Sequence, residues 1–128
     1  MIQRIQSVYL LIAVIVTLVA VILCVEREKF SDFCGYVVLS SLSVILSVVA
    51  LFRYAHRKSQ MKLISVSIFN LCIAIVMAAV MSCVMSKQAT LFNYVYIILL
   101  SLAVLFNYMA RRSVVRDEMK VRSADRIR

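Results

Sequence analysis

Side chains that could carry out acid–base, metal or covalent chemistry are few in this 128-residue chain and lie far apart along it. The single histidine, His56, has no second histidine and no cysteine near it, whereas zinc sites need three or four ligands. The sequence has no nucleophile beside a base and no glycine-rich loop that could hold a phosphate. We therefore expect His56 to be a solvated surface residue, and we expect no catalytic residue, no cofactor and no metal.

The four cysteines show no C-x-x-C spacing, which argues against a redox or zinc motif. Two interpretations stay open. Cys34 and Cys83 could form a bridge if they lie in an oxidising external compartment. Alternatively, the cysteines are small buried thiols between helices, since free cysteine behaves as a small hydrophobe.

None of the six Asp and Glu residues lies within the long apolar stretches of the chain. Ion-coupled transport usually leaves an ionisable residue at membrane depth, because the coupled charge needs a site of its own. An intramembrane hydrolase would also need a nucleophile with a base or paired carboxylates. The sequence therefore disfavours both activities, and it leaves open a passive pore built by several copies.

Four stretches without Asp, Glu, Lys, Arg or His make up most of the chain, and each is 20 to 24 residues long. A helix needs roughly 20 residues to cross a hydrocarbon core of about 30 Å. One Gly and no Pro favour continuous helices with short connections. We predict an all-α membrane protein whose residues 1–128 form one antiparallel four-transmembrane-helix bundle. The expected spans are about 6–26, 34–54, 63–86 and 90–111, and the fourth helix should extend into a basic cytoplasmic tail, 112–128.

The basic residues alternate between rich and poor segments along the chain. Twelve of the fifteen Lys and Arg residues lie before the first span, in the second connection or in the tail, and three lie in the first and third connections. Basic segments next to spans stay in the cytoplasm. Both termini and the second connection should therefore be cytoplasmic.

Small and polar residues recur at steps of three and four within each span, which places them on one helical face. They are Ala13, Thr17 and Ala20; Ser40, Ser43 and Ser47; Asn70, Ala74 and Ala78; and Ala103 and Asn107. Helices in lipid associate through such small residues, so we interpret them as the packing seam. The alternative is that one stripe, chiefly the serines, faces a partner. We also expect Asn70, Asn93 and Asn107 to bond to other helices.

The second connection and the tail mix acids and amides with basic residues, and Glu118 precedes Arg122 by four, the favourable helical order for an ion pair. This mixture suits specific hydrogen bonding to a protein. A basic segment is also attracted to anionic lipid head groups, and the alternative is a solvated tail that only sets orientation. The predicted contact residues are Arg4, Arg57, Lys58, Gln60, Lys62, Arg112, Asp117, Glu118, Arg122, Ser123, Asp125, Arg126 and Arg128.

The start MIQRIQSVYLL, the ending RDEMKVRSADRIR and the central RKSQMKL, followed by Asn70, resemble an uncharacterised family of small four-span membrane proteins from Bacteroidetes-type bacteria, domain of unknown function 4293. The resemblance covers the whole chain. It implies a four-span fold, a membrane location and a bacterial context, and thus the bacterial inner membrane. The family carries no established activity, so the resemblance implies no mechanism.

The sequence thus favours a non-enzymatic inner-membrane protein that acts as an accessory or scaffolding subunit, binding membrane lipids and a protein partner or a second copy of itself. The alternative is a small oligomeric transporter or channel that moves a solute along Ser40, Ser43, Ser47, Asn70 and Asn107. A nucleic-acid tether is disfavoured, because the absence of aromatic residues after Tyr108 removes base stacking.

Reporter fusions test the orientation. A cytoplasmic reporter should be active when fused after Ser59 or Arg128, and an external reporter should be active after Ser31 or Lys87, because the basic segments stay in the cytoplasm. Reporter activity in intact cells is the measurement. An external signal after Arg128 would contradict the orientation.

Overall fold

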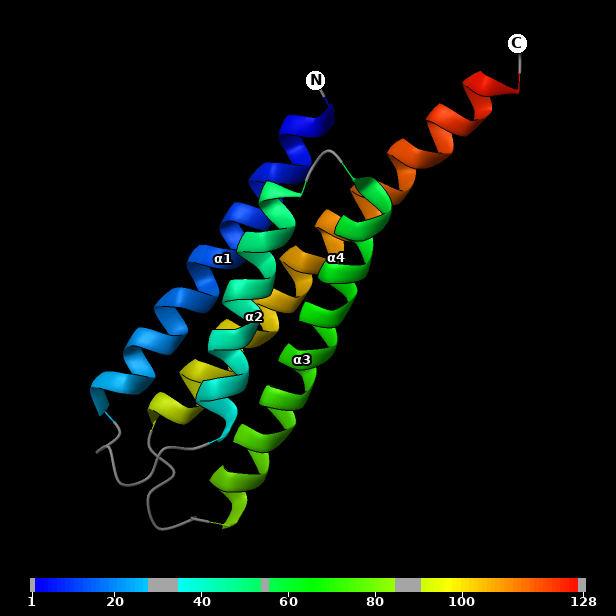
Figure 1. Cartoon of the computed structure of the whole chain (residues 1–128). Helices are drawn as coiled ribbons and strands as arrows, with labels where there is room; N and C mark the ends of the chain where they lie inside the picture. The colour runs from blue at the N-terminus through cyan, green and yellow to red at the C-terminus, as the bar shows by residue number, and fades with distance from the viewer. Residues whose placement is uncertain (1, 28–34, 54–55, 85–90, 127–128) are drawn as a thin grey trace.

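The protein is a bundle of four antiparallel helices (Figure 1). The computed structural model describes residues 2–27, 35–53, 56–84 and 91–126. The helices are α1 (Ile2–Arg27), α2 (Gly35–Phe52), α3 (Arg57–Val84) and α4 (Leu91–Asp125). The predicted four-helix fold is confirmed, including the extension of the fourth helix far beyond the apolar run.

The starts of α1 and α3 and the ends of α2 and α4 lie at one end of the bundle (Figure 1). This end, called the basic end below, carries the basic residues of the second connection and of the tail. At the same end α4 projects past the other three helices (Figure 1). The ends of α1 and α3 and the starts of α2 and α4 lie at the opposite end, as expected for a chain that crosses a membrane four times (Figure 1).

All four helices are long and apolar enough to cross a membrane. A helix satisfies its backbone amides and carbonyls internally, which is what a segment needs where no water can reach it. The sequence placed the start of the third span at residue 63, but α3 begins six residues earlier, at Arg57. The backbone N–H of Gln60 donates to the carbonyl of His56 at 3.0 Å, so the basic residues before the span form the first turns of α3.

Each helix packs beside two others, in the order α1–α2–α3–α4 and back to α1. The eleven residues of the predicted packing seam are all buried: Ala13, Thr17, Ala20, Ser40, Ser43, Ser47, Asn70, Ala74, Ala78, Ala103 and Asn107. Large apolar side chains point outward instead, as shown by Phe69, which is 69% exposed, and Val76, which is 60% exposed. Small residues inside and large residues outside are the arrangement that lipid favours.

The buried apolar residues form two clusters along the bundle axis. The larger cluster combines alanines of three helices, including Ala20, Ala74 and Ala103, with Leu71 and Leu100. The second cluster lies toward the basic end and consists of Leu10, Ala50, Ile64, Ala110 and Val114. An alanine at a helix crossing allows the two backbones to approach closely, so the size of these side chains sets the spacing of the bundle.

Enlarging a seam alanine should destabilise the bundle. Ala74 is fully buried within the larger cluster, so Ala74→Leu forces the helices apart and should lower the free energy of unfolding by about 1–3 kcal/mol. Denaturation in mixed detergent micelles, followed by circular dichroism, measures the change. The control is Val76→Leu on the exposed face of the same helix, and equal effects of the two substitutions would contradict the packing role of Ala74.

Candidate functional site

The most connected polar cluster joins α2 and α3 inside the apolar part of the bundle. The side-chain amide of Asn70 donates to the backbone carbonyl of Leu39 at 2.6 Å and to Oγ of Ser43 at 2.8 Å. One turn closer to the basic end, the hydroxyls of Ser47 and Ser67 lie 2.9 Å apart. These side chains bond to one another, so their arrangement holds the two helices together.

A tyrosine links α2 and α4, which lie diagonally opposite each other in the bundle. The hydroxyl of Tyr96 on α4 donates to Oγ of Ser40 on α2 at 2.9 Å. The rings of Tyr96 and Tyr36 are tilted against each other, with centroids 5.4 Å apart. Within the described residues, α2 and α4 are joined by side chains rather than by close approach of their backbones. Tyr96 is buried and fixes the position of α4 relative to α2.

The sequence analysis missed Tyr96 and Ser67, and both extend the predicted seams. Tyr96 lies seven residues before Ala103, and Ser67 lies three residues before Asn70, spacings that keep a residue on the same face. The prediction for Asn107 was wrong: its amide nitrogen donates to the carbonyl of Ala103 in its own helix, and its buried Oδ1 has no partner in the described structure. Asn93 is half-buried and forms no side-chain hydrogen bond with the described residues.

The cysteines differ in their surroundings. Cys24 is buried, with its sulfur 3.9 Å from the hydroxyl oxygen of Tyr36, whereas Cys72 and Cys83 are exposed free thiols. The interpretation of buried seam thiols therefore holds for Cys24 and is wrong for Cys72 and Cys83. Cys34, the other member of the suggested bridge, lies outside the described residues. His56 is exposed, and the described residues contain no group of side chains that could hold a metal ion.

At the basic end, two polar residues join α1 to α4. The side-chain amide of Gln6 donates to the carboxylate of Asp117, and both side chains are buried, with exposed fractions of 7% and 8%. Gln6 was missed by the sequence analysis, although it lies seven residues before Ala13 and continues the seam of the first helix. Asp117 lies seven residues after Ala110 and continues the seam of α4 in the same way.

Two of the predicted contact residues are therefore not at the surface. Asp117 faces α1, and Gln60 is 4% exposed in the first turns of α3. The sequence analysis counted both as exposed because they lie in charged segments, but helical periodicity directs them inward. Arg57 and Glu118 are partly exposed, and the exposed contact residues are Lys58, Lys62, Arg112, Arg122, Ser123 and Arg126. The side chains of Arg4, Asp125 and Arg128 lie outside the described part of the chain.

The last part of α4 and the residue that follows it, residues 118–126, form what we call the arm. Its residues Lys120, Val121, Arg122 and Ser123 are all exposed, and Arg122 forms an ion pair with Glu118 at 2.7 Å. An exposed pair of this kind adds only a few tenths of a kcal/mol to the helix. The arm therefore presents basic and apolar side chains without burying them against the bundle.

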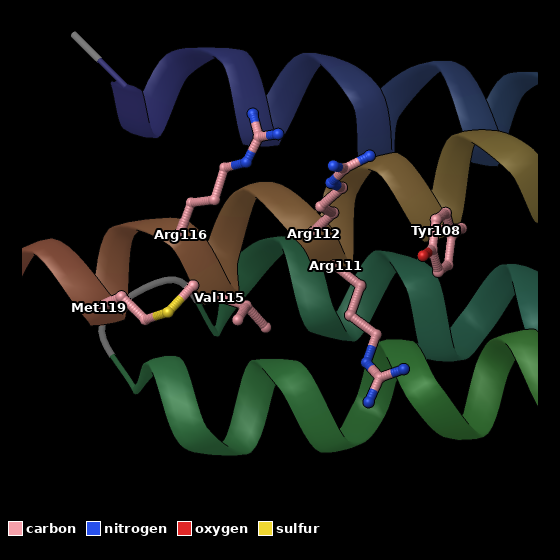
Figure 2. A pocket seen from close by; sticks show the side chains of 6 residues that line it. All are labelled: Tyr108, Arg111, Arg112, Val115, Arg116 and Met119. Atoms are coloured by element: carbon pink, nitrogen blue, oxygen red, sulfur yellow. The ribbon is translucent and has the colours of Figure 1, made fainter.

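Between the apolar part of α4 and the arm, three arginines surround an open hollow on the outer face of the helix (Figure 2). The hollow measures about 350 Å³ and is lined by Tyr108, Arg111, Arg112, Val115, Arg116 and Met119. Arg112 and Arg116 extend toward the side on which α1 runs, and Arg111 extends the opposite way (Figure 2). The described structure places no carboxylate in an ion pair with any of the three.

Four membrane-length apolar helices, held together by small residues and polar bonds, define a multi-pass α-helical membrane protein. The chain belongs to the family described as "Domain of unknown function (DUF4293)", which matches residues 26–127. The predicted membership of this family is thus confirmed; the match includes the central motif and nearly all of the ending, and it does not include the start of the chain before residue 26. Comparison with curated proteins gave no match, and neither did comparison with solved structures.

Removing Gln6 should destabilise the junction of α1 and α4. Gln6→Leu leaves the buried carboxylate of Asp117 without its donor, which should cost about 1–3 kcal/mol of unfolding free energy. A double-mutant cycle with Asp117→Leu, measured by denaturation in mixed micelles, should give a coupling energy between the two positions. Glu118→Gln is the matched control, because the adjacent acid is paired at the surface and its loss should change stability by less than about 0.5 kcal/mol. Purely additive effects at positions 6 and 117 would contradict the bond.

Proposed function

We propose that this protein is a non-enzymatic subunit of a bacterial inner membrane, an accessory or scaffolding protein that binds a protein partner through its basic cytoplasmic end. The extension of α4 past its apolar part, which ends in the arm, is the observation that carries the proposal. α4 continues for 15 residues beyond Ala110, which is about 22 Å at 1.5 Å per residue. A helix that only crossed the membrane would not need this length.

The side chains of the arm also support a docking role. Val121 is 46% exposed and stands beside exposed Lys120 and Arg122, so one short helix offers apolar and charged contacts together. Helical segments that expose a few apolar anchors among charges are a common form of protein recognition. Because basic residues outnumber acidic ones on the arm, the expected partner surface is acidic. The exposed residues at the start of α3, such as Lys58 and Lys62, extend this surface.

The proposed orientation places the basic end in the cytoplasm. The start of α1, the start of α3 and the end of α4 lie at that end of the bundle (Figure 1), which supports one orientation for the whole basic surface. The absence of aromatic residues after Tyr108 argues against nucleic acid as the partner, because stacking platforms supply much of single-strand binding.

No observation specifically favours the alternative of a small oligomeric transporter or channel. Four of the five polar side chains on which such a pathway would depend bond to another helix, and Asn107 bonds within its own helix. Asn70 bonds to Ser43, and Ser47 bonds to Ser67. Ser40 accepts a hydrogen bond from Tyr96. A solute moving along this seam would have to break the bonds that hold the helices together.

Site-specific crosslinking in the native membrane tests the proposal. A photoreactive residue at Ser123, which is exposed on the arm, should give a crosslinked product of one defined mass that contains another protein. The same residue placed at Phe69, exposed on the lipid-facing side of α3, is the control and should give no such product. Replacing Lys120, Arg122 and Arg126 by Gln should weaken the product, because it removes the proposed attraction to an acidic surface. If Ser123 gives only lipid adducts or products between copies of this chain, the partner proposal is wrong.

A further inference from the structure

The outer face of α4 changes from apolar to cationic within one helical turn. Leu102, Leu105 and Tyr108 are exposed by 40%, 59% and 53%. Arg112 follows Tyr108 by four residues, and Arg116 follows Arg112 by four, so the three lie on one side of the helix. An apolar stripe suited to lipid chains therefore leads directly to two guanidinium groups at the end of the apolar part of α4.

Among the described residues, Arg112 and Arg116 have no carboxylate in an ion pair with them. Like charges four residues apart repel each other on a helix. The two nearest described acids are engaged elsewhere: Asp117 points inward to Gln6, and Glu118 pairs with Arg122. Both arginines extend to the same side of α4 and border the hollow of about 350 Å³ (Figure 2). An anion between them would relieve the repulsion, and the hollow leaves room for one.

We propose that Arg112 and Arg116 bind the phosphate of an anionic phospholipid head group, while its acyl chains lie along Leu105 and Leu102. The planar guanidinium presents paired N–H donors that match phosphate oxygens, so two arginines one turn apart can clamp one phosphate. Tyr108 lies between the charged and apolar parts, where aromatic side chains are favoured at membrane interfaces.

The apolar stripe is what favours a lipid over an acidic protein segment as the occupant. A soluble partner could reach the arginines, but it would leave Leu102 and Leu105 to other molecules, whereas a phospholipid contacts both parts at once. The inference is independent of the protein partner proposed for the arm, because it concerns residues before position 118.

Lipid selectivity of the purified full-length protein tests the proposal. The protein is reconstituted in phosphatidylcholine vesicles with a minor fraction of phosphatidylglycerol. Electron paramagnetic resonance of spin-labelled lipids then gives the association of phosphatidylglycerol relative to phosphatidylcholine. The double variant R112Q/R116Q should lower this relative association by about fivefold for each arginine that contacts the head group.

The matched control is R122Q/R126Q. It removes the same number of arginines at the same spacing, but from the arm, and it should leave the selectivity close to that of the native chain. If both double variants lose the same lipid selectivity, the selectivity depends on net charge alone and the proposal is overturned. Unchanged lipid selectivity in R112Q/R116Q, together with loss of a crosslinked protein, would assign the arginines to a protein partner and would also overturn it.

A second variant guards against misfolding or altered orientation. R112K/R116K keeps every positive charge, so it preserves the signal that orients the chain, but it lacks the paired donors of guanidinium. Its selectivity should fall between those of the native chain and R112Q/R116Q. Selectivity equal to the native value would show that charge alone suffices, and would overturn the clamp.

Discussion

Close approach of helices is the constraint on which the rest of this structure depends. In lipid each helix satisfies its own backbone, so helices gain little by hiding apolar surface from one another and associate instead through tight contacts. Alanines such as Ala74 and Ala103 make this approach possible, and both are fully buried. Many of the large apolar side chains, such as Phe69 and Val76, lie on the outside, where lipid accepts them, and a few, such as Leu71 and Leu100, fill the space between the helices.

Close approach also explains where the polar side chains lie. With the helix backbones near each other, Asn70 on α3 reaches the backbone of Leu39 on α2, and the hydroxyls of Ser47 and Ser67 meet directly. Gln6 and Asp117 use the same principle at the basic end, between α1 and α4. Their bond lies about two turns before the end of α4, so it ties the base of the arm to the bundle and leaves the rest of the arm exposed.

The charge pattern of the surface at the basic end depends on which partners the two acids of α4 take. Asp117 is sequestered by Gln6 and Glu118 is paired with Arg122, so Arg112 and Arg116 are left without carboxylate neighbours among the described residues. Net charge alone would give only a diffuse attraction to anionic surfaces. The pairing of individual residues instead divides the basic end into an arginine-lined hollow near the membrane and a mixed-charge arm farther out.

The sequence was enough to predict the four helices and their buried faces. The length of the uncharged stretches indicated the helices, because a chain that spans lipid must satisfy its backbone hydrogen bonds internally. The positions of the small residues indicated the buried faces. Segment charge was a poorer guide to individual side chains. Asp117 and Gln60 lie in charged segments and yet are buried, and Asn107 bonds within its own helix rather than to a neighbour. Helical periodicity identifies which residues share a face. Which residue of a neighbouring helix each of them contacts depends on the axial shift and the rotation of the packed helices. The tertiary structure therefore decided that Gln6 pairs with Asp117, that Tyr96 reaches Ser40, and that Arg112 and Arg116 form no ion pair with a carboxylate of the described residues.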